Sequence, residues 1–132
     1  MQITCINEGL VIPAKHYGGS ERIFKILFES LIEKGHNVNL LAGAGSKLTN
    51  CKLLTYKSKA KPNYFDRTFR RLDFSLKSFL LSNNSDIIHT FNFWPNYHFI
   101  LNNLKKPIIY RQGNSACHDD FLKIKRNNPK YG

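Results

Sequence analysis

Apolar and polar residues follow two different periods along this chain, and the alternation predicts strands and helices in turn. Short apolar runs predict five strands, at Gln2–Asn7, Val38–Ala42, Cys51–Tyr56, Asp86–Thr90 and Pro107–Tyr110. Apolar residues three or four apart predict helices at Ser20–Lys34, Asp66–Leu81, Pro95–Leu104 and Ser115–Arg126. Strands that alternate with helices form βαβ units. The sequence therefore predicts an α/β fold with a Rossmann-like parallel sheet flanked by helices.

Polar and glycine residues recur where the first, fourth and fifth predicted strands end. They are Gly18-Gly19, the stretch His89–Phe93 and the stretch Arg111–Ser115. Ligands of parallel sheets bind outside the carboxyl ends of the strands. Glycines at a strand-to-helix junction let a ligand approach the backbone, and the N–H groups of the helix start favour phosphate. The alternative for the glycine pair is a tight turn with Ser20 as the helix cap.

Size and composition suit a single domain over residues 1–132 with an apolar core. Hydrophobic residues make up 42% of the 132 residues, and ten are Phe and six are Tyr. No run approaches the roughly 20 apolar residues of a membrane-spanning helix. The start has no basic segment typical of a signal peptide, and the three cysteines show no metal-binding spacing. We predict a cytoplasmic protein that needs no metal or other cofactor.

The net charge of +11 is concentrated in one part of the chain. Residues 1–46 carry four basic and four acidic side chains, whereas residues 47–81 carry nine basic and two acidic ones. Such a surplus favours an anionic partner, such as phospholipid, nucleic acid or a phosphorylated substrate. The alternative is a solvated basic surface with no partner.

The segment Tyr64–Leu81 combines this charge with an apolar stripe. The stripe has helical spacing and consists of Phe65, Phe69, Leu72, Leu76, Phe79 and Leu80. Four basic residues are interleaved with it: Arg67, Arg70, Arg71 and Lys77. Basic amphipathic helices attach to anionic membranes, so these four are candidate membrane-docking residues on the inner face of the membrane. The alternative is that the stripe packs on the sheet.

Several short motifs occur in an order that resembles the amino-terminal half of family-4 glycosyltransferases, which have the GT-B fold. The matching motifs span most of residues 1–113: Ile6-Asn7-Glu8-Gly9-Leu10, Tyr17-Gly18-Gly19-Ser20-Glu21-Arg22, Glu33-Lys34-Gly35-His36-Asn37-Val38, Ser85-Asp86-Ile87-Ile88-His89 and Lys106-Pro107-Ile108-Ile109. The combination of the glycine-pair motif with Lys-Gly-His is the most specific part of the likeness.

The resemblance implies a nucleotide sugar as donor substrate and a glycan or lipid-linked acceptor. It implies that Gly18, Gly19 and Arg22 handle phosphate, that Gln112 and Gly113 lie near the sugar, and that His89 contacts ligand or caps its strand. Many relatives have histidine where Gln112 stands. The paired-glutamate motif of the carboxy-terminal, donor-binding half does not occur in this chain. We therefore expect one incomplete GT-B half, inactive by itself, which is a fragment, a degenerate product or one part of a split enzyme.

The predicted function is that of an acceptor-side glycosyltransferase domain. The complete enzyme would transfer a hexose from the nucleotide sugar to its acceptor in surface polysaccharide assembly. The rival is a non-catalytic basic α/β module that binds nucleic acid or another polyanion, although no specific nucleic-acid motif occurs in the sequence. An oxidoreductase-type dinucleotide domain is a third option. Such a domain carries the motif G-x-G-x-x-G, whereas the two glycines of this chain, Gly18 and Gly19, are adjacent.

Overall fold

The computed structural model describes residues 1–7, 11–13, 19–56, 63–91 and 104–111. Within them, seven elements follow one another along the chain: β1 (Gln2–Asn7), α1 (Gly19–Glu33), β2 (Asn37–Gly43), β3 (Lys52–Tyr56), α2 (Tyr64–Ser82), β4 (Ile87–Phe91) and β5 (Ile108–Arg111). These bounds agree with the predicted ones to within two residues. The predicted helices at Pro95–Leu104 and Ser115–Arg126 lie almost wholly or wholly outside the described residues.

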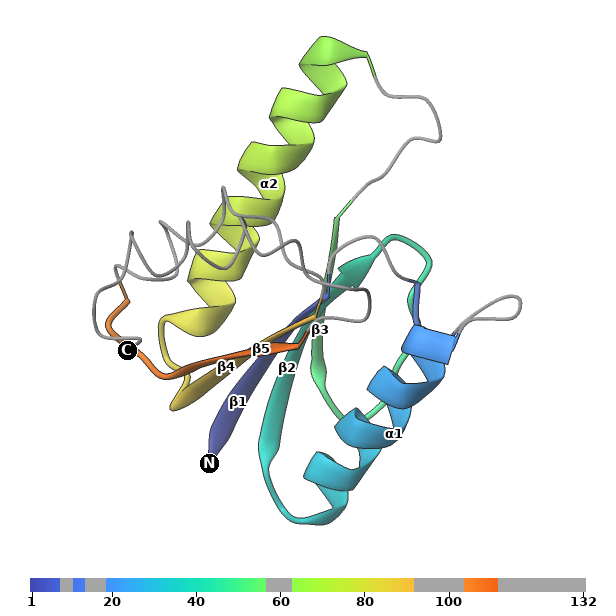
Figure 1. The fold of residues 1–132 in the computed structure, drawn as a ribbon, viewed down its shortest axis with the longest axis vertical. Coiled ribbons are helices and arrows are strands. Elements are labelled where there is room, and N and C mark those ends of the chain that lie inside the picture. The colour runs from blue at the N-terminus through green and yellow to red at the C-terminus, as the bar shows by residue number, and fades with distance from the viewer. Residues whose placement is uncertain (8–10, 14–18, 57–62, 92–103, 112–132) are drawn as a thin grey trace.

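The five strands form one sheet in the order β3-β2-β1-β4-β5, and every neighbouring pair is parallel. Figure 1 shows α1 on one face of this sheet and α2 on the other. The chain moves outward from β1 to β3 and then crosses back, past β1, to β4. This reversal between β1 and β4 is the topological switch point of a doubly wound sheet. The predicted α/β, Rossmann-like fold is confirmed.

The central strands are covered on both faces, as a parallel sheet requires. Side chains of β1 alternate between two cores, so that Cys5 joins the cluster under α1 and Ile6 joins the cluster under α2. Burial raises the pKa of the Cys5 thiol to about 12, as expected for a small core residue.

Helix α1 buries part of its apolar face, and a glycine with positive φ follows its last turn. Phe24 and Phe28 are fully buried, whereas Ile23 is exposed. At the other end, Gly35 has a φ of +79°, which glycine adopts without strain. The N–H of Gly35 donates to the Ile32 carbonyl and that of His36 to the Leu31 carbonyl, which is the Schellman pattern. The predicted end of this helix at Lys34 is confirmed to within one residue.

Helix α2 begins two residues earlier than predicted because Asn63 caps it. The Asn63 side-chain oxygen accepts a hydrogen bond from the Asp66 backbone N–H at 2.7 Å. This bond satisfies one of the N–H groups that the first turn leaves open. The first turns of α2 extend beyond the carboxyl ends of the strands in Figure 1.

Helix α2 does not pack its apolar stripe against the sheet, as the alternative to membrane docking required. A different face of the helix meets the strands. Its buried residues are Phe74, Ser78, Leu81 and Ser82. The ring of Phe74 packs edge-on against Tyr56 of β3 with centroids 4.9 Å apart. The stripe points away from the sheet, and Phe65 and Phe69 keep 72% and 71% of their surface exposed. Two buried serines, which are small, let the helix approach the strands closely.

Candidate functional site

Four side chains lie near the carboxyl ends of β1, β4 and β5, and we call Asn7, His89, Phe91 and Arg111 the carboxyl-edge cluster. Asn7, Phe91 and Arg111 are the last residues of their strands, and His89 lies two residues before the end of β4. Parallel pairing aligns Asn7 with Phe91 and Phe91 with Arg111. The cluster therefore straddles the switch point between β1 and β4. In doubly wound sheets this is the position at which ligands bind.

Phe91 ties the cluster to helix α1. Its ring packs edge-on against Phe24 with centroids 4.4 Å apart, and it lies 4.7 Å from the His89 ring. The Arg111 guanidinium carbon lies 5.3 Å from the Phe91 ring centre, within the range of a cation–π contact. The Phe91 ring therefore contacts the Arg111 guanidinium on the site side and packs against Phe24 in the first half of α1.

Asn7 has the least expected environment in the cluster. Its side chain is fully buried, and neither its Nδ2 nor its Oδ1 has a hydrogen-bond partner among the residues that the structure describes. A buried amide without partners costs on the order of 1–3 kcal/mol per unsatisfied group. Among the described residues, the buried hydroxyls of Ser78 and Ser82 in α2 also lack partners. What distinguishes Asn7 is its place at the carboxyl end of β1, where a bound ligand can supply the missing bonds.

His89 is half-buried, and its environment favours the neutral imidazole. Burial lowers its pKa below the ordinary value, and the nearby positive charge of Arg111 lowers it further. A neutral imidazole offers one donor and one acceptor, which suits a hydroxyl group. Arg111, which is exposed, carries the fixed positive charge of the cluster.

The start of α1 lies on the same side of the molecule as the carboxyl ends of the strands, as Figure 1 shows. Gly19 is the first residue of α1 and Arg22 lies in its first turn, exposed. Glycine is not required by the backbone at position 19, because positive φ among described glycines occurs only at Gly35 and Gly45. A Cβ at Gly19 would meet no atom within 4 Å, so the helix start is open to a ligand.

Three of the predicted site residues, Gly18, Gln112 and Gly113, lie outside the described residues. Asn7 occurs in the sequence analysis only as part of a motif, and Arg111 only as the first residue of the stretch Arg111–Ser115 at a strand end; neither was predicted as an individual site residue. The signal that could have found them is their place as the last residues of β1 and β5, on either side of β4.

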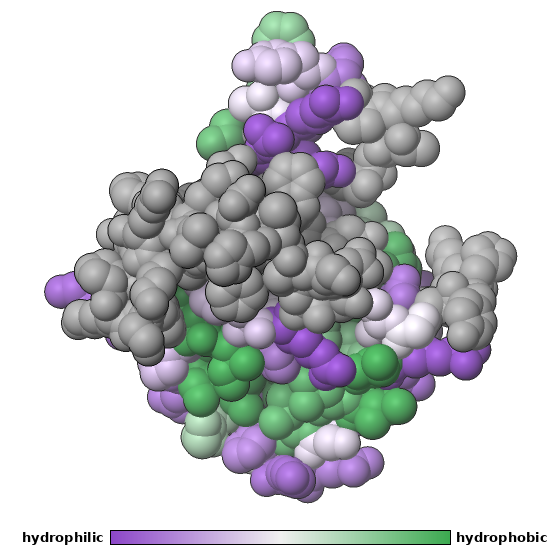
Figure 2. Space-filling view, in the orientation of Figure 1, coloured by the Kyte–Doolittle hydropathy of each residue, from purple (hydrophilic) through white to green (hydrophobic). Residues whose placement is uncertain are grey.

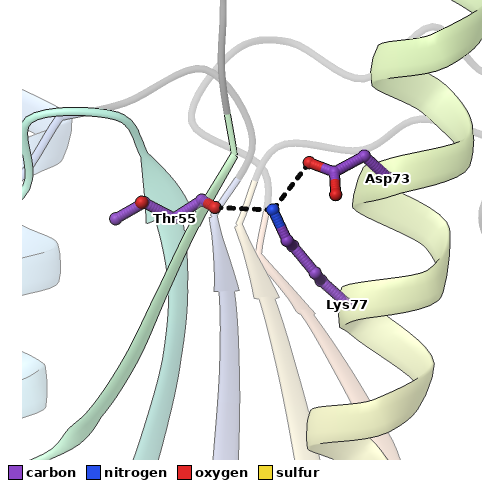
Figure 3. A network of polar contacts seen from close by, with 3 residues as sticks. All are labelled: Thr55, Asp73 and Lys77. Carbon is purple, nitrogen blue, oxygen red and sulfur yellow. Dashed lines mark hydrogen bonds and ion pairs between the residues drawn. The ribbon is translucent and has the colours of Figure 1, made fainter.

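The four candidate membrane-docking residues lie along α2. Lys77 is engaged within the fold, because its Nζ donates to the Thr55 carbonyl at 2.9 Å and to Asp73 at 2.8 Å (Figure 3). This lysine fastens α2 to β3. Arg67 and Arg71 are exposed and Arg70 is half-buried.

Neither a protein-family model nor a curated protein sequence matches the chain. Among the described residues, no three His, Cys, Asp or Glu side chains are grouped as metal ligands. The helices of the described part include none that is long and apolar enough to cross a membrane.

Proposed function

We propose that this chain is the acceptor-side half of a GT-B glycosyltransferase similar to family 4. The complete enzyme transfers a hexose from a nucleotide sugar to a glycan or lipid-linked acceptor in surface polysaccharide assembly. The observation that carries the proposal is the carboxyl-edge cluster, which places an unpartnered buried amide, a neutral imidazole and a cation at one switch point. The motif likeness of residues 1–113 supports the same class.

The chemistry of the cluster suits a ligand that combines hydroxyl groups with phosphate. The open start of α1 offers backbone N–H groups and a positive dipole end to phosphate. Arg111 adds a full positive charge. His89 and Asn7 can each donate and accept hydrogen bonds, and sugar hydroxyls need both. A nucleotide sugar has both kinds of group, and its pyrophosphate joins them.

The proposed role of this half is to bind and orient. Neutral His89 would hydrogen-bond a sugar hydroxyl, and Arg111 with the start of α1 would offset the charge that develops on the leaving diphosphate. Electrostatic groups fixed in advance stabilise such charge without reorganising during the reaction. No general base is assigned, because the cluster contains no carboxylate.

The test is a comparison of ligand classes on one protein. Binding of UDP- and GDP-hexoses, NAD and a random oligonucleotide is measured by ligand-observed NMR for the parent, Arg111→Gln and Lys52→Gln. Lys52 is the matched control, since it is an exposed cation at the opposite, amino-terminal end of β3. We expect the parent to bind the nucleotide hexoses. Arg111→Gln should weaken this binding about tenfold, because loss of one charged contact costs roughly 1.4 kcal/mol or more. Lys52→Gln should leave it unchanged.

Preference for the oligonucleotide, with steep salt dependence and equal losses in both variants, would instead support the polyanion-binding module. Preference for NAD over the nucleotide hexoses would support a dinucleotide domain of the oxidoreductase type.

A further inference from the structure

The outward face of α2 carries an apolar seam, formed by Phe65, Phe69, Leu72, Leu76 and Phe79. The steps between these residues are four, three, four and three, so they mark the a and d positions of two consecutive heptads. Leu72 and Leu76, in the middle of the seam, are 63% and 60% exposed. Such spacing is typical of a helix that packs along a second helix.

The seam is large for a surface that meets only water. Exposed Phe and Leu side chains offer on the order of 100–200 Å² each, so the seam presents roughly 500–600 Å² per molecule. Isolated soluble domains rarely expose apolar patches of more than a few hundred Å². When two copies pair through this seam, each copy buries the seam and the polar residues beside it. The area buried per copy then approaches the roughly 800 Å² per partner of a standard protein interface.

The charges around the seam decide between a helix and an anionic membrane as its partner. At 3.6 residues per turn, Asp66 and Asp73 lie about 80–100° round the helix from the centre of the seam. Arg67, Arg70 and Arg71 lie about 120–160° away, on the side that α2 turns toward the sheet. A surface under the seam would meet the acidic residues first. The arginines would lie about 8–10 Å behind it, at or beyond the screening length of about 8 Å at physiological salt.

The flanks of the seam suit a second copy of the same helix. On one flank lie Thr68 and Ser75, and on the other lie Asp66, Asp73 and Leu80. The basic residue nearest either flank is Lys77, which is engaged with Asp73 and Thr55 of its own molecule. The seams of two copies can therefore approach without bringing their arginines together. The polar contacts of Asp73 are already directed to Lys77 within its own molecule, at 2.8 Å. The interface would be isologous, as in most homodimers.

We propose that α2 is the pairing surface of a homodimer, in which the seams of two copies pack against each other. The pairing leaves the carboxyl-edge cluster outside the interface, because no residue of the cluster belongs to α2. The proposal is therefore independent of the glycosyltransferase assignment.

The experiment is sedimentation velocity over about two decades of protein concentration, from roughly 5 to 500 μM. The parent, Leu72→Asp, Leu76→Asp and Ile26→Asp are compared. Ile26 is the matched control, because it is 64% exposed on α1 and receives the same change. We expect a concentration-dependent dimer for the parent and for Ile26→Asp, and at least a tenfold weaker dimer for the two seam variants. Thermal midpoints measured at low concentration, where the parent is monomeric, should stay equal, since all three positions are exposed.

A parent that stays monomeric throughout, or a dimer that the seam variants leave intact, would overturn the proposal. A second measurement is co-sedimentation with phosphatidylglycerol-containing and neutral vesicles, for the parent, Leu72→Asp and Arg67/Arg70/Arg71→Glu. The dimer predicts that the triple variant still dimerises and that vesicles do not compete with pairing. Monomers that bind anionic vesicles and lose this binding in both variants would show that the seam docks on a membrane instead.

Discussion

At the scale of single residues, the carboxyl edge of the sheet concentrates features that a merely structural strand end does not need. Asn7 is buried without partners, His89 is held neutral, and Arg111 is stacked against an aromatic ring. Each feature has its own physical cause, and all three side chains end up beside the same switch point because adjacent parallel strands end together.

Gly19→Val should damage ligand binding more than folding. Gly19 has open space where a Cβ would go, and its backbone does not require glycine. We expect the free energy of unfolding to change by less than about 1 kcal/mol, which is the size of helix-propensity differences. The valine side chain would occupy the approach of a ligand to the helix start, so nucleotide-hexose affinity should fall about tenfold or more. Thermal melts and ligand-observed NMR measure the two quantities. Unchanged binding with a sharply lower midpoint would mean that the glycine serves only the turn.

His89 should make stability depend on pH. Its pKa is lowered in the folded protein, so the unfolded chain binds its proton more readily. The stabilisation is present above the unfolded value of about 6.5 and declines as pH falls from there toward the folded pKa. Urea unfolding from pH 7.5 to 5 should show a steeper loss for the parent than for His89→Asn. Identical slopes for the two proteins would contradict the burial of a neutral imidazole.

At the scale of elements, periodicity alone predicted five strands and two helices within two residues of their bounds. Strand and helix periods are local properties, which is why the sequence sufficed. The orientation of α2 could not be predicted, because the helix has two faces that can each meet a sheet. Side-chain packing determines which face of α2 meets the sheet, because Phe74 packs against Tyr56 and the small Ser78 and Ser82 let the helix approach the strands.

The Lys77 contacts provide a direct test of how α2 is attached. Lys77→Met keeps the aliphatic stem but removes the hydrogen bonds to Thr55 and Asp73. We expect the free energy of unfolding to fall by about 1–2 kcal/mol, typical of a partly buried charged hydrogen bond. Lys25→Met is the control, since Lys25 pairs with Glu29 at 3.4 Å on the surface of α1 and should cost less than about 0.5 kcal/mol. Equal losses in urea titrations of both variants would argue against the α2–β3 attachment.

At the scale of the whole molecule, the sheet order explains why one edge becomes the site. In sheets with the order β3-β2-β1-β4-β5, ligands bind at the carboxyl ends of the strands beside the switch point, which here lies between β1 and β4. The sequence predicted which strands border this edge, because polar residues follow them. It could not predict that Asn7 would be buried without partners, since that depends on how neighbouring strands and α1 enclose it.

Residues 1–132 by themselves should transfer no sugar. A GT-B enzyme holds most of its donor on a second half, and binding energy from that half is needed to position the reacting atoms. Incubation of the purified chain with labelled UDP- and GDP-hexoses and candidate glycan acceptors should give no product above the background of buffer alone. Sustained turnover would show that the proposed division of labour between two halves is wrong.

The central claim is that nucleotide sugars bind at the carboxyl edge of the sheet. Amide chemical-shift mapping tests this claim most directly. A ¹⁵N-labelled sample is titrated with UDP- and GDP-hexoses, and the shifts are assigned to residues. We expect the largest changes at Asn7, Gly19, Arg22, His89 and Arg111, and none at Gly35 to Asn37, which lie at the opposite edge. Changes confined to that opposite edge, or no changes at saturating nucleotide sugar, would contradict the account.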